Sequence, residues 1–201
     1  MSVAVNAARI AWVVGRWLPN AAGRLQQAAL ELYAERGYEQ TTVAEIADRA
    51  GLTERTFFRH FADKREVLFG GSGELQKLIV DAVDAAPASA RPMEAIAVGL
   101  AAAGAIFDAS RRAYSLQRQS VIDANPELQE RELVKLASLA TVLADALRRR
   151  GVQDPAAELT AEAGVAVFRV AFERWVHDDS ERDFAWFVHE GIAELRTVAA
   201  G

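Results

Sequence analysis

The side chains best suited to specific chemistry in this 201-residue chain lie in a short stretch just after Gly51. Arg55 carries a planar guanidinium with several N–H donors, and other polar side chains flank it. Such groups can donate hydrogen bonds to the edges of nucleic-acid bases and to phosphate oxygens. The polar residues that we expect to face solvent or a groove are Thr53, Glu54, Arg55, Thr56, Arg59 and His60.

Two short helices are predicted to position these side chains. Thr42 and Glu45 form a capping-box pattern that begins the first helix, and apolar residues recur after it at helical spacing. Gly51 suits the left-handed residue that ends a helix, and Thr53 is a favoured N-cap for the second helix. The pattern predicts a helix-turn-helix within residues 41–64. An ordinary helical hairpin in a bundle has the same periodicity, so that alternative stays open at this point.

Helices are predicted on both sides of this motif. Residues 24–36 carry an amphipathic stripe that would pack across the two helices and complete a three-helix domain. Residues 64–84 have the pattern of one long helix, but three glycines lie inside it. Each glycine costs roughly 1 kcal/mol of helix propensity against alanine. We therefore expect a kink or break near Gly70–Gly73.

The remainder of the chain is predicted to be helical as well, with no strand-like alternation and no internal repeat. The expected fold class is all-α, with an N-terminal three-helix domain, a C-terminal helical bundle and about nine helices in total. A linker with two prolines is expected at residues 87–92. The expected helices after it cover residues 93–109, 110–122, 126–150, 154–177 and about 180 to the end. The expected divisions are a flexible extension at 1–23, the helix-turn-helix domain at 24–69, and a larger domain at 70–201.

Composition restricts the classes of function. The chain has no cysteine, which excludes disulfides, thiolate metal sites and cysteine nucleophiles and fits a reducing cytoplasm. The net charge is −5, but residues 1–65 hold nine Lys/Arg against seven Asp/Glu. This small positive balance coincides with the helix-turn-helix and supports a nucleic-acid partner without proving one. The apolar run at residues 10–14 is too short to span a bilayer, so we expect no membrane association and a cytoplasmic location.

We find no residues that predict an enzyme, a metal centre or a cofactor. The sequence has no Gly-rich phosphate loop, HExxH motif or nucleophile elbow. His177 has Glu173 and Glu181 at helical spacing, so a weak divalent-metal site is conceivable. An exposed histidine at a helix end is the simpler interpretation. We therefore predict no catalytic residues, no metal ligands and no cofactor.

A small-molecule pocket is a second functional feature that the pattern allows. Large aromatic and polar residues occur on helices that are expected to face one another, and ligand sites are mostly apolar with a few placed polar groups. An aromatic stripe at helical spacing is more often plain core, and that interpretation stays open. The candidate lining residues are Phe107, Tyr114, Gln117, Arg118, Phe168, Phe172 and Trp175.

The last two predicted helices carry more apolar surface than one small bundle is expected to bury. Two such pairs from two chains could pack as a four-helix bundle, which predicts a homodimer. The candidate interface residues are Ala163, Val167, Val170, Arg174, Phe184, Phe187, Val188, Ile192 and Leu195.

The segment from Ala28 to Leu68, AALELYAERGYEQTTVAEIADRAGLTERTFFRHFADKREVL, resembles the tetracycline-repressor (TetR) family of transcriptional regulators. The resemblance covers about a fifth of the chain. It implies an all-α homodimer whose third helix enters the major groove of double-stranded DNA and whose last two helices form the dimer interface. It also implies a central cavity for a small effector. The expected function is a ligand-responsive repressor released from a palindromic operator. The alternative is a small-molecule-binding helical protein without a DNA function.

The resemblance also implies roles for particular residues. It places Thr53, Arg55, Thr56 and His60 at the DNA surface. It gives Thr42 and Lys64 the role of holding phosphates. Many members have a tyrosine at the position of Phe58, whose hydroxyl touches a phosphate, and phenylalanine cannot make that bond. The strongly basic arm common before the first helix is absent here, although Arg9 and Arg16 could touch the DNA backbone if the extension has a role at all.

Overall fold

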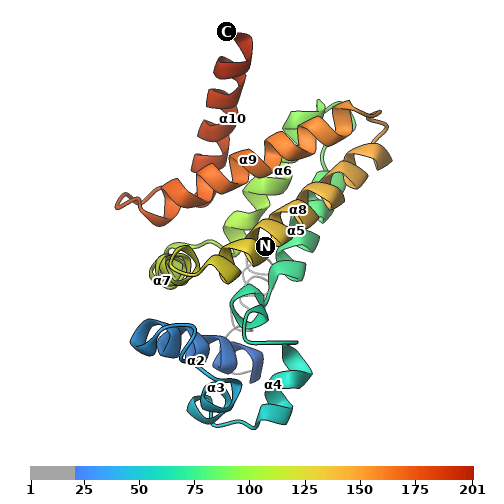
Figure 1. Cartoon of the computed structure of the whole chain (residues 1–201). Coiled ribbons are helices and arrows are strands. Elements are labelled where there is room, and N and C mark those ends of the chain that lie inside the picture. Colours follow the sequence, from blue (N-terminus) through green and yellow to red (C-terminus); the bar gives the residue numbers. More distant parts are fainter. Residues whose placement is uncertain (1–20) are drawn as a thin grey trace, which may run out of the picture. The chain divides into compact units, whose positions relative to one another are not determined.

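All regular structure in the described part of the chain, residues 21–201, is helical (Figure 1). In this computed structural model, that part contains nine α-helices, α2 to α10, and three short 3-10 turns. The predicted all-α class is therefore confirmed. The chain divides into two compact units, Met1–Gly70 and Gly71–Gly201. Most of the extension predicted at residues 1–23, including Arg9 and Arg16, lies outside the described residues.

The first unit is built around three helices and a 3-10 turn. Helix α2 packs against each of the other three elements. The side chains of Leu25, Ile46 and Phe57, one from each helix, are fully buried where the helices meet. The elements are α2 (Ala21–Arg36), α3 (Val43–Arg49), α4 (Glu54–His60) and the 3-10 turn η1 (Glu66–Phe69).

Local sequence explains where α3 and α4 begin. The Glu45 carboxylate accepts a hydrogen bond from the backbone N–H of Thr42 at 2.9 Å, and the Thr42 hydroxyl accepts one from the N–H of Glu45 at 3.3 Å. The Thr53 hydroxyl accepts from the N–H of Thr56 at 3.2 Å. Between the two helices, Gly51 takes a φ of +63°, which an L side chain rarely adopts. The predicted capping box, N-cap and glycine turn are all confirmed.

The long helix predicted over residues 64–84 is interrupted. The 3-10 turn η1 ends at Phe69, and α5 (Ser72–Asp84) begins after two glycines. Gly71 has a φ of +92°, a left-handed conformation that glycine adopts without steric cost. The expected break near Gly70–Gly73 is confirmed, and it also separates the two compact units.

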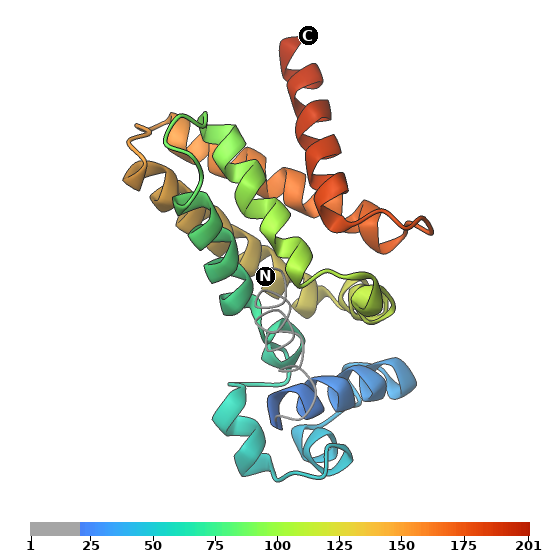
Figure 2. The same cartoon turned by 180° about the vertical axis from the view of Figure 1, so that it is seen from behind.

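The second unit is a bundle of six helices. Helix α9 packs against α6, α8 and α10, while α5 packs against α6 and α8 (Figure 2). The buried core lies among these five helices and includes Ile79, Leu100, Leu143 and Trp175. The helices are α5 (Ser72–Asp84), α6 (Pro92–Ala102), α7 (Arg112–Asp123), α8 (Pro126–Arg149), α9 (Ala156–Val176) and α10 (Phe184–Ala200).

Helices α5 and α6 cross closely at a glycine. A Cβ atom placed on Gly99 would lie 2.4 Å from Val83 Cγ2 and 2.9 Å from the carbonyl oxygen of Ile79. Both distances are shorter than van der Waals contact, so the crossing has room only for a hydrogen at this position. The residue therefore sets how near α6 approaches α5.

The helix predicted over residues 93–109 is shorter than expected. Helix α6 ends at Ala102, and a 3-10 turn (Ala103–Ala105) follows. The Asp108 carboxylate then accepts hydrogen bonds from the backbone N–H groups of Ser110 and Arg111 at 2.8 and 3.2 Å. Aspartate in this role begins a new element and competes with continuation of the old one. The apolar periodicity therefore predicted a helix that continues beyond the observed end of α6.

The helices of residues 21–201 differ in length and in apolar composition. None of them alone has both the length and the apolar composition needed to cross a bilayer. One helix pair, 92–105 with 109–123, meets those criteria only when its two pieces are combined, and it is bent by 67°.

Candidate nucleic-acid interface

The outward face of α4 presents polar side chains to solvent. Phe57 and Phe61 are buried on the inner side, with exposed fractions of 0 % and 7 %. Arg55, Arg59 and His60 are exposed on the other sides of the same helix. Neither arginine has a hydrogen bond or an ion pair to any other residue in the part of the chain that the structure describes. Their guanidinium donors are therefore available to an external acceptor.

The hydroxyl groups of the two threonines at the start of α4 already take part in hydrogen bonds within the helix. Thr53 is the N-cap, and its hydroxyl lies 3.1 Å from that of Thr56. Glu54 lies exposed in the first turn, where a carboxylate is favourable next to the helix N-terminus. Phe58 is 55 % exposed, a large apolar surface for a solvent-facing side chain. The predicted DNA contacts of these four residues stay predictions.

Lys64 has a structural role that the sequence did not indicate. Its ammonium donates to the carbonyl oxygens of Tyr38, Thr41 and Glu39 at 3.0, 3.3 and 3.4 Å. It also lies 4.2 Å from the centroid of the Tyr38 ring. An ammonium has three N–H donors, and all three are used here. We therefore assign Lys64 to holding the loop before α3, and the phosphate contact that the resemblance implied stays a prediction.

Thr42 lies exposed at the start of α3, but its donors are also used. Its N–H and its hydroxyl both donate to the Glu45 carboxylate at 2.9 Å. These two hydrogen bonds, with a smaller contribution from Arg36, lower the pKa of Glu45 below its ordinary value. The phosphate contact of Thr42 stays a prediction, and it requires the hydroxyl to turn away from Glu45.

Four of the candidate effector residues meet in the second unit, but as a packed aromatic cluster. The ring centroid of Phe107 lies 6.0 Å from that of Phe168, 5.2 Å from that of Phe172 and 5.6 Å from that of Trp175. Phe184 joins them at 4.9 Å from Phe107. Trp175 is fully buried, while Phe107 and Phe172 are half-buried. The cluster thus contributes to the core, and an effector contact of its half-buried rings remains a prediction.

The other candidate effector residues lie on α7, apart from these ring contacts. The Arg118 guanidinium pairs with Glu132 of α8 at 3.7 Å, and burial lowers the pKa of Arg118. Tyr114 lies beneath the Arg111 guanidinium, 5.2 Å from its ring centroid, and burial raises the pKa of its phenol. Gln117 is exposed. The structure therefore does not join these polar groups and the aromatic rings in one described cavity.

Arg112, which the sequence analysis missed, joins α7 to the loop before α10. Its guanidinium donates to the carbonyl oxygens of Asp178, Ser180 and Arg182 at 2.6, 2.9 and 3.1 Å. Its Cζ lies 5.3 Å from the centroid of the Trp175 ring. Its partners are backbone atoms more than sixty residues away, so no local pattern reveals them.

Five of the nine candidate interface residues are buried within their own unit. Helix α10 packs on both α6 and α9, and this packing covers the side chains that the amphipathic pattern assigned to a partner. These five lie in the core of the chain, and their predicted contact with a partner stays a prediction. Val170 is 44 % exposed, Arg174 is exposed, and Ala163 and Leu195 are half-buried, so these four remain interface candidates. The five buried residues are Val167, Phe184, Phe187, Val188 and Ile192.

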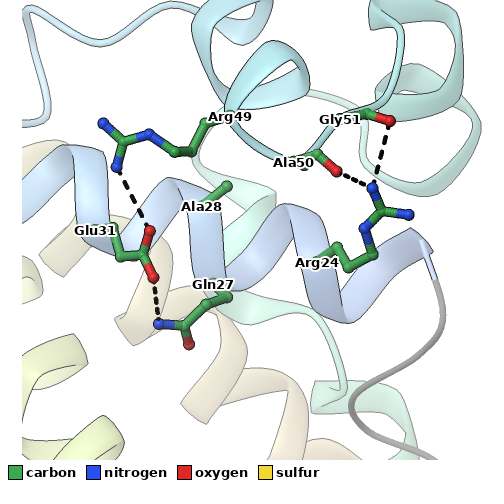
Figure 3. A pocket seen from close by; sticks show the side chains of 7 residues that line it. All are labelled: Arg24, Gln27, Ala28, Glu31, Arg49, Ala50 and Gly51. Carbon is green, nitrogen blue, oxygen red and sulfur yellow. Dashed lines mark hydrogen bonds and ion pairs between the residues drawn. The ribbon is translucent and has the colours of Figure 1, made fainter.

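One depression in the first unit and one in the second are lined by both polar and apolar residues. The first, of about 420 Å³, lies between α2 and the end of α3 (Figure 3). The second, of about 300 Å³, lies between α5 and α8. The first is lined by Arg24, Gln27, Ala28, Glu31, Arg49, Ala50 and Gly51, and the second by Gly73, Gln76, Lys77, Val80, Val142, Asp145 and Arg149.

His177 lies at the end of α9, with its ring Nδ1 2.9 Å from the carbonyl oxygen of Glu173. No group of three or more histidine, aspartate or glutamate side chains within residues 21–201 is arranged to hold a metal ion. The geometry therefore adds no support to the metal site that the spacing of His177 allowed.

Comparison with known proteins relates both units to one family. Residues 25–69 match the model for bacterial regulatory proteins of the tetR family, and residues 90–200, more than half of the chain, match the model of the MftR C-terminal domain. The chain is 28 % identical over 170 residues to MftR of Mycobacterium tuberculosis, which is named as a mycofactocin biosynthesis transcriptional regulator. That match covers 83 % of this chain and 85 % of MftR. The chain is also 40 % identical over 73 residues to the transcriptional regulator TcmR of Streptomyces glaucescens. This second match covers 36 % of this chain and spans only 32 % of TcmR.

Solved structures share the fold. FadR from Bacillus subtilis in complex with stearoyl-CoA has a TM-score of 0.58 at 20 % identity and is matched over 86 % of this chain and 96 % of its own. FadR from Thermus thermophilus in complex with lauroyl-CoA has a TM-score of 0.50 at 24 % identity, over 87 % and 92 %. With a capped helix-turn-helix in the first unit, a helical bundle in the second and family models matching both, this chain belongs to the TetR family of DNA-binding transcriptional regulators.

Proposed function

We propose that this regulator is a repressor that binds a palindromic operator as a homodimer and leaves it when a small effector binds. The observation that carries the proposal is the outward face of α4. There, Arg55 and Arg59 are exposed and have no partner among the described residues, while Phe57 and Phe61 anchor the opposite side in the core. A rigid helix with free guanidinium groups is suited to the major groove.

The geometry suggests how the two kinds of DNA contact are divided. Arg55 lies in the first turn of α4, and in helix-turn-helix proteins the N-terminal residues of the recognition helix contact base edges. A guanidinium there can pair with O6 and N7 of a guanine. Arg59 and His60 lie in the last turn and are assigned to bases or phosphates further along the groove. Two copies would occupy half-sites about 34–36 Å apart or somewhat more.

The second unit is the proposed site of effector binding. Its aromatic cluster offers the half-buried rings of Phe107 and Phe172, and α7 offers Tyr114 and Arg118. Apolar rings in one cluster and a cation on α7 suit a ligand that has a long apolar chain and an acidic head group, provided that the head group replaces Glu132 as the partner of Arg118. Two structures with this fold are complexes with acyl-CoA compounds, so acyl-CoA thioesters are the first candidates. Any effector acts only through different affinities for the DNA-bound and free arrangements.

Selection of bound duplexes from a random DNA pool, using the purified chain, tests the proposed DNA function. We expect a consensus with two inverted halves. A variant with Arg55→Ala and Arg59→Ala serves as the matched control, because it keeps the fold of α4 and removes the free guanidinium groups. Failure of the wild type to enrich any sequence would favour the alternative, a small-molecule-binding helical protein without a DNA function.

The effector proposal has a separate test. The selected duplex is bound by the wild type and titrated with stearoyl-CoA, lauroyl-CoA or acetyl-CoA. Release by the long-chain compounds but not by acetyl-CoA is expected, because acetyl-CoA has the same head group without the apolar chain. Binding that none of these compounds changes would exclude acyl-CoA thioesters and leave the DNA function standing.

A further inference from the structure

We propose that Arg24 of α2 positions the recognition helix α4 by holding the turn between α3 and α4, and that it thereby supports sequence-specific binding without contacting DNA. The inference rests on the proposed DNA function of α4. It assigns to Arg24 a role that neither the amphipathic pattern nor the capping motifs indicate, because the partners of Arg24 are backbone atoms.

The contacts of Arg24 are directed at the end of α3. Its Nη2 donates to the carbonyl oxygen of Ala50 and, at 3.3 Å, to that of Gly51 (Figure 3). The last carbonyl groups of a helix lack partners within the helix. A cation placed there satisfies them and is also favoured by the helix dipole. Arg24 thus adds partners from another helix to the backbone cap that the N–H groups of Gly51 and Leu52 already make at the end of α3.

The turn fits closely against this guanidinium. A Cβ atom placed on Gly51 would lie 2.9 Å from Arg24 Nη2, so a side chain at this position would displace the guanidinium from its contact with the turn. Only Leu52 and Thr53 separate Gly51 from the first residue of α4, and Thr53 is the N-cap of that helix. With so short a connection, a displacement of the turn carries the start of α4 with it.

A second arginine also links the end of α3 to α2. This arginine lies on α3, and its acceptors lie on α2. Arg49 of α3 donates to Glu35 at 2.8 and 3.0 Å and to Glu31 at 3.5 Å. The depression of about 420 Å³ lies between the two ties. The end of α3 is therefore held by charged side chains in addition to its buried apolar residues Ile46, Ala47 and Ala50. Losing the Arg24 tie should loosen the turn without unfolding the unit, because these apolar contacts remain.

The experiment compares three variants of the full chain. Arg24→Gln removes the tie, and Arg24→Lys keeps a charged donor that can still reach a carbonyl. Arg36→Gln is the matched control. It removes the same charge from the same helix, but Arg36 pairs with the Glu45 side chain at 2.7 Å and not with the turn. Affinities are measured across a range of salt concentrations for the selected duplex and for a scrambled duplex of equal composition.

Arg24→Gln should weaken binding to the selected duplex by about tenfold, the order expected when one charged hydrogen bond is lost. Its affinity for the scrambled duplex and its salt dependence should match those of Arg36→Gln, while Arg24→Lys recovers most of the specific affinity. Deuterium uptake at the amides of residues 52–56 should rise in Arg24→Gln and not in Arg36→Gln.

Two results would overturn the inference. An equal loss on both duplexes, with a salt slope reduced by about one ion, would make Arg24 a phosphate contact. Unchanged specific binding with unchanged deuterium uptake would show that the tie has no role in positioning α4. Either result leaves the proposed DNA binding intact, because that binding is tested separately by whether the wild type selects a duplex.

Discussion

An exposed phenyl ring cannot form a conventional hydrogen bond. On a helix that is proposed to enter the major groove, it must therefore contact DNA through apolar groups. Phe58 is 55 % exposed on α4 and packs edge-on against Phe57. It lacks the hydroxyl with which many family members reach a phosphate. A phenyl group in the groove can instead contact the methyl group of a thymine. We therefore expect Phe58 to favour thymine at one position of each half-site.

Replacing thymines by uracil, one at a time, in the selected duplex tests this expectation. Loss of the contacted methyl should weaken wild-type binding by about fourfold, since a buried methyl or methylene group contributes roughly 0.8 kcal/mol. Phe58→Ala should bind both duplexes equally, and Phe58→Tyr should keep the preference. If Phe58→Ala still distinguishes thymine from uracil at that position, another side chain makes the contact.

Single residues were predictable from sequence where their partners are near in the chain. Thr42 and Glu45 form their capping box within one turn, so a pattern of two letters is enough. Lys64 and Arg112 bind backbone carbonyl groups that folding brings from 23 to 70 residues away. Backbone carbonyls have no sequence signature. The sequence pattern therefore did not indicate these contacts. The resemblance gave Lys64 a different role, and Arg112 was given no role.

At the scale of elements, the capping box of α3 should give the first unit a pH-dependent stability. Hydrogen bonds from Thr42 lower the pKa of Glu45 in the folded chain. The stabilisation is therefore complete above the ordinary glutamate pKa, about 4.3, and is lost as the pH falls through the lower folded-state value. Glu45→Gln keeps an acceptor for the cap but has no carboxyl group to titrate.

Denaturant unfolding of both proteins between about pH 6 and about pH 3 provides the measurement. The advantage of the wild type over Glu45→Gln should shrink as the pH falls, because only the wild type loses a charged acceptor. A difference that stays constant over this range would show that Glu45 does not stabilise the folded chain through its charge.

The close crossing of α5 and α6 predicts opposite effects of two glycine substitutions. Gly99→Ala should lower the free energy of unfolding by about 1–3 kcal/mol, because its methyl group would meet a backbone carbonyl of α5. Gly73→Ala, on α5 with nothing within 4 Å of its Cβ position, should raise it by about 0.4–1 kcal/mol. Thermal or urea unfolding measures both, and a stabilising Gly99→Ala would contradict the close crossing.

The spacing of apolar residues predicted that each segment is a helix. The residues at which the helices begin and end depend on capping and backbone hydrogen bonds, which this spacing does not reveal. The apolar run after Met93 continues past Ala102 in the sequence, yet the helix stops there. The Asp108 carboxylate then accepts hydrogen bonds from backbone N–H groups, and a new 3-10 turn begins at Ala109. Break positions were predictable only where glycines marked them, as at Gly70–Gly73.

At the scale of the whole molecule, the predicted homodimer should depend on the exposed side of α9. Val170→Glu should convert the dimer to a monomer in sedimentation and weaken operator binding, since a buried carboxylate without a partner is costly. Val98→Glu is the matched control, because Val98 on α6 has the same exposed fraction of 44 %. Dimers that persist in Val170→Glu would place the interface elsewhere.

The sequence could not separate surfaces buried within one chain from surfaces buried between two. An apolar stripe on α10 has the same period in both cases, and the structure shows that α6 and α9 already cover most of it. Only exposure in the folded chain distinguishes Val170 from Val188. The exposed part of the candidate interface is accordingly smaller than the set of residues that the pattern predicted.

The proposed function depends most on base recognition by α4, and the base preferences of Arg55→Ala test this directly. Affinities are measured for the selected duplex and for every single-base change in one half-site. We predict a loss of roughly 1–3 kcal/mol, with relaxed preference confined to one or two positions, as expected for a bidentate base contact. A uniform loss at all positions, or no loss at all, would contradict the assignment of α4 as the element that selects sequence.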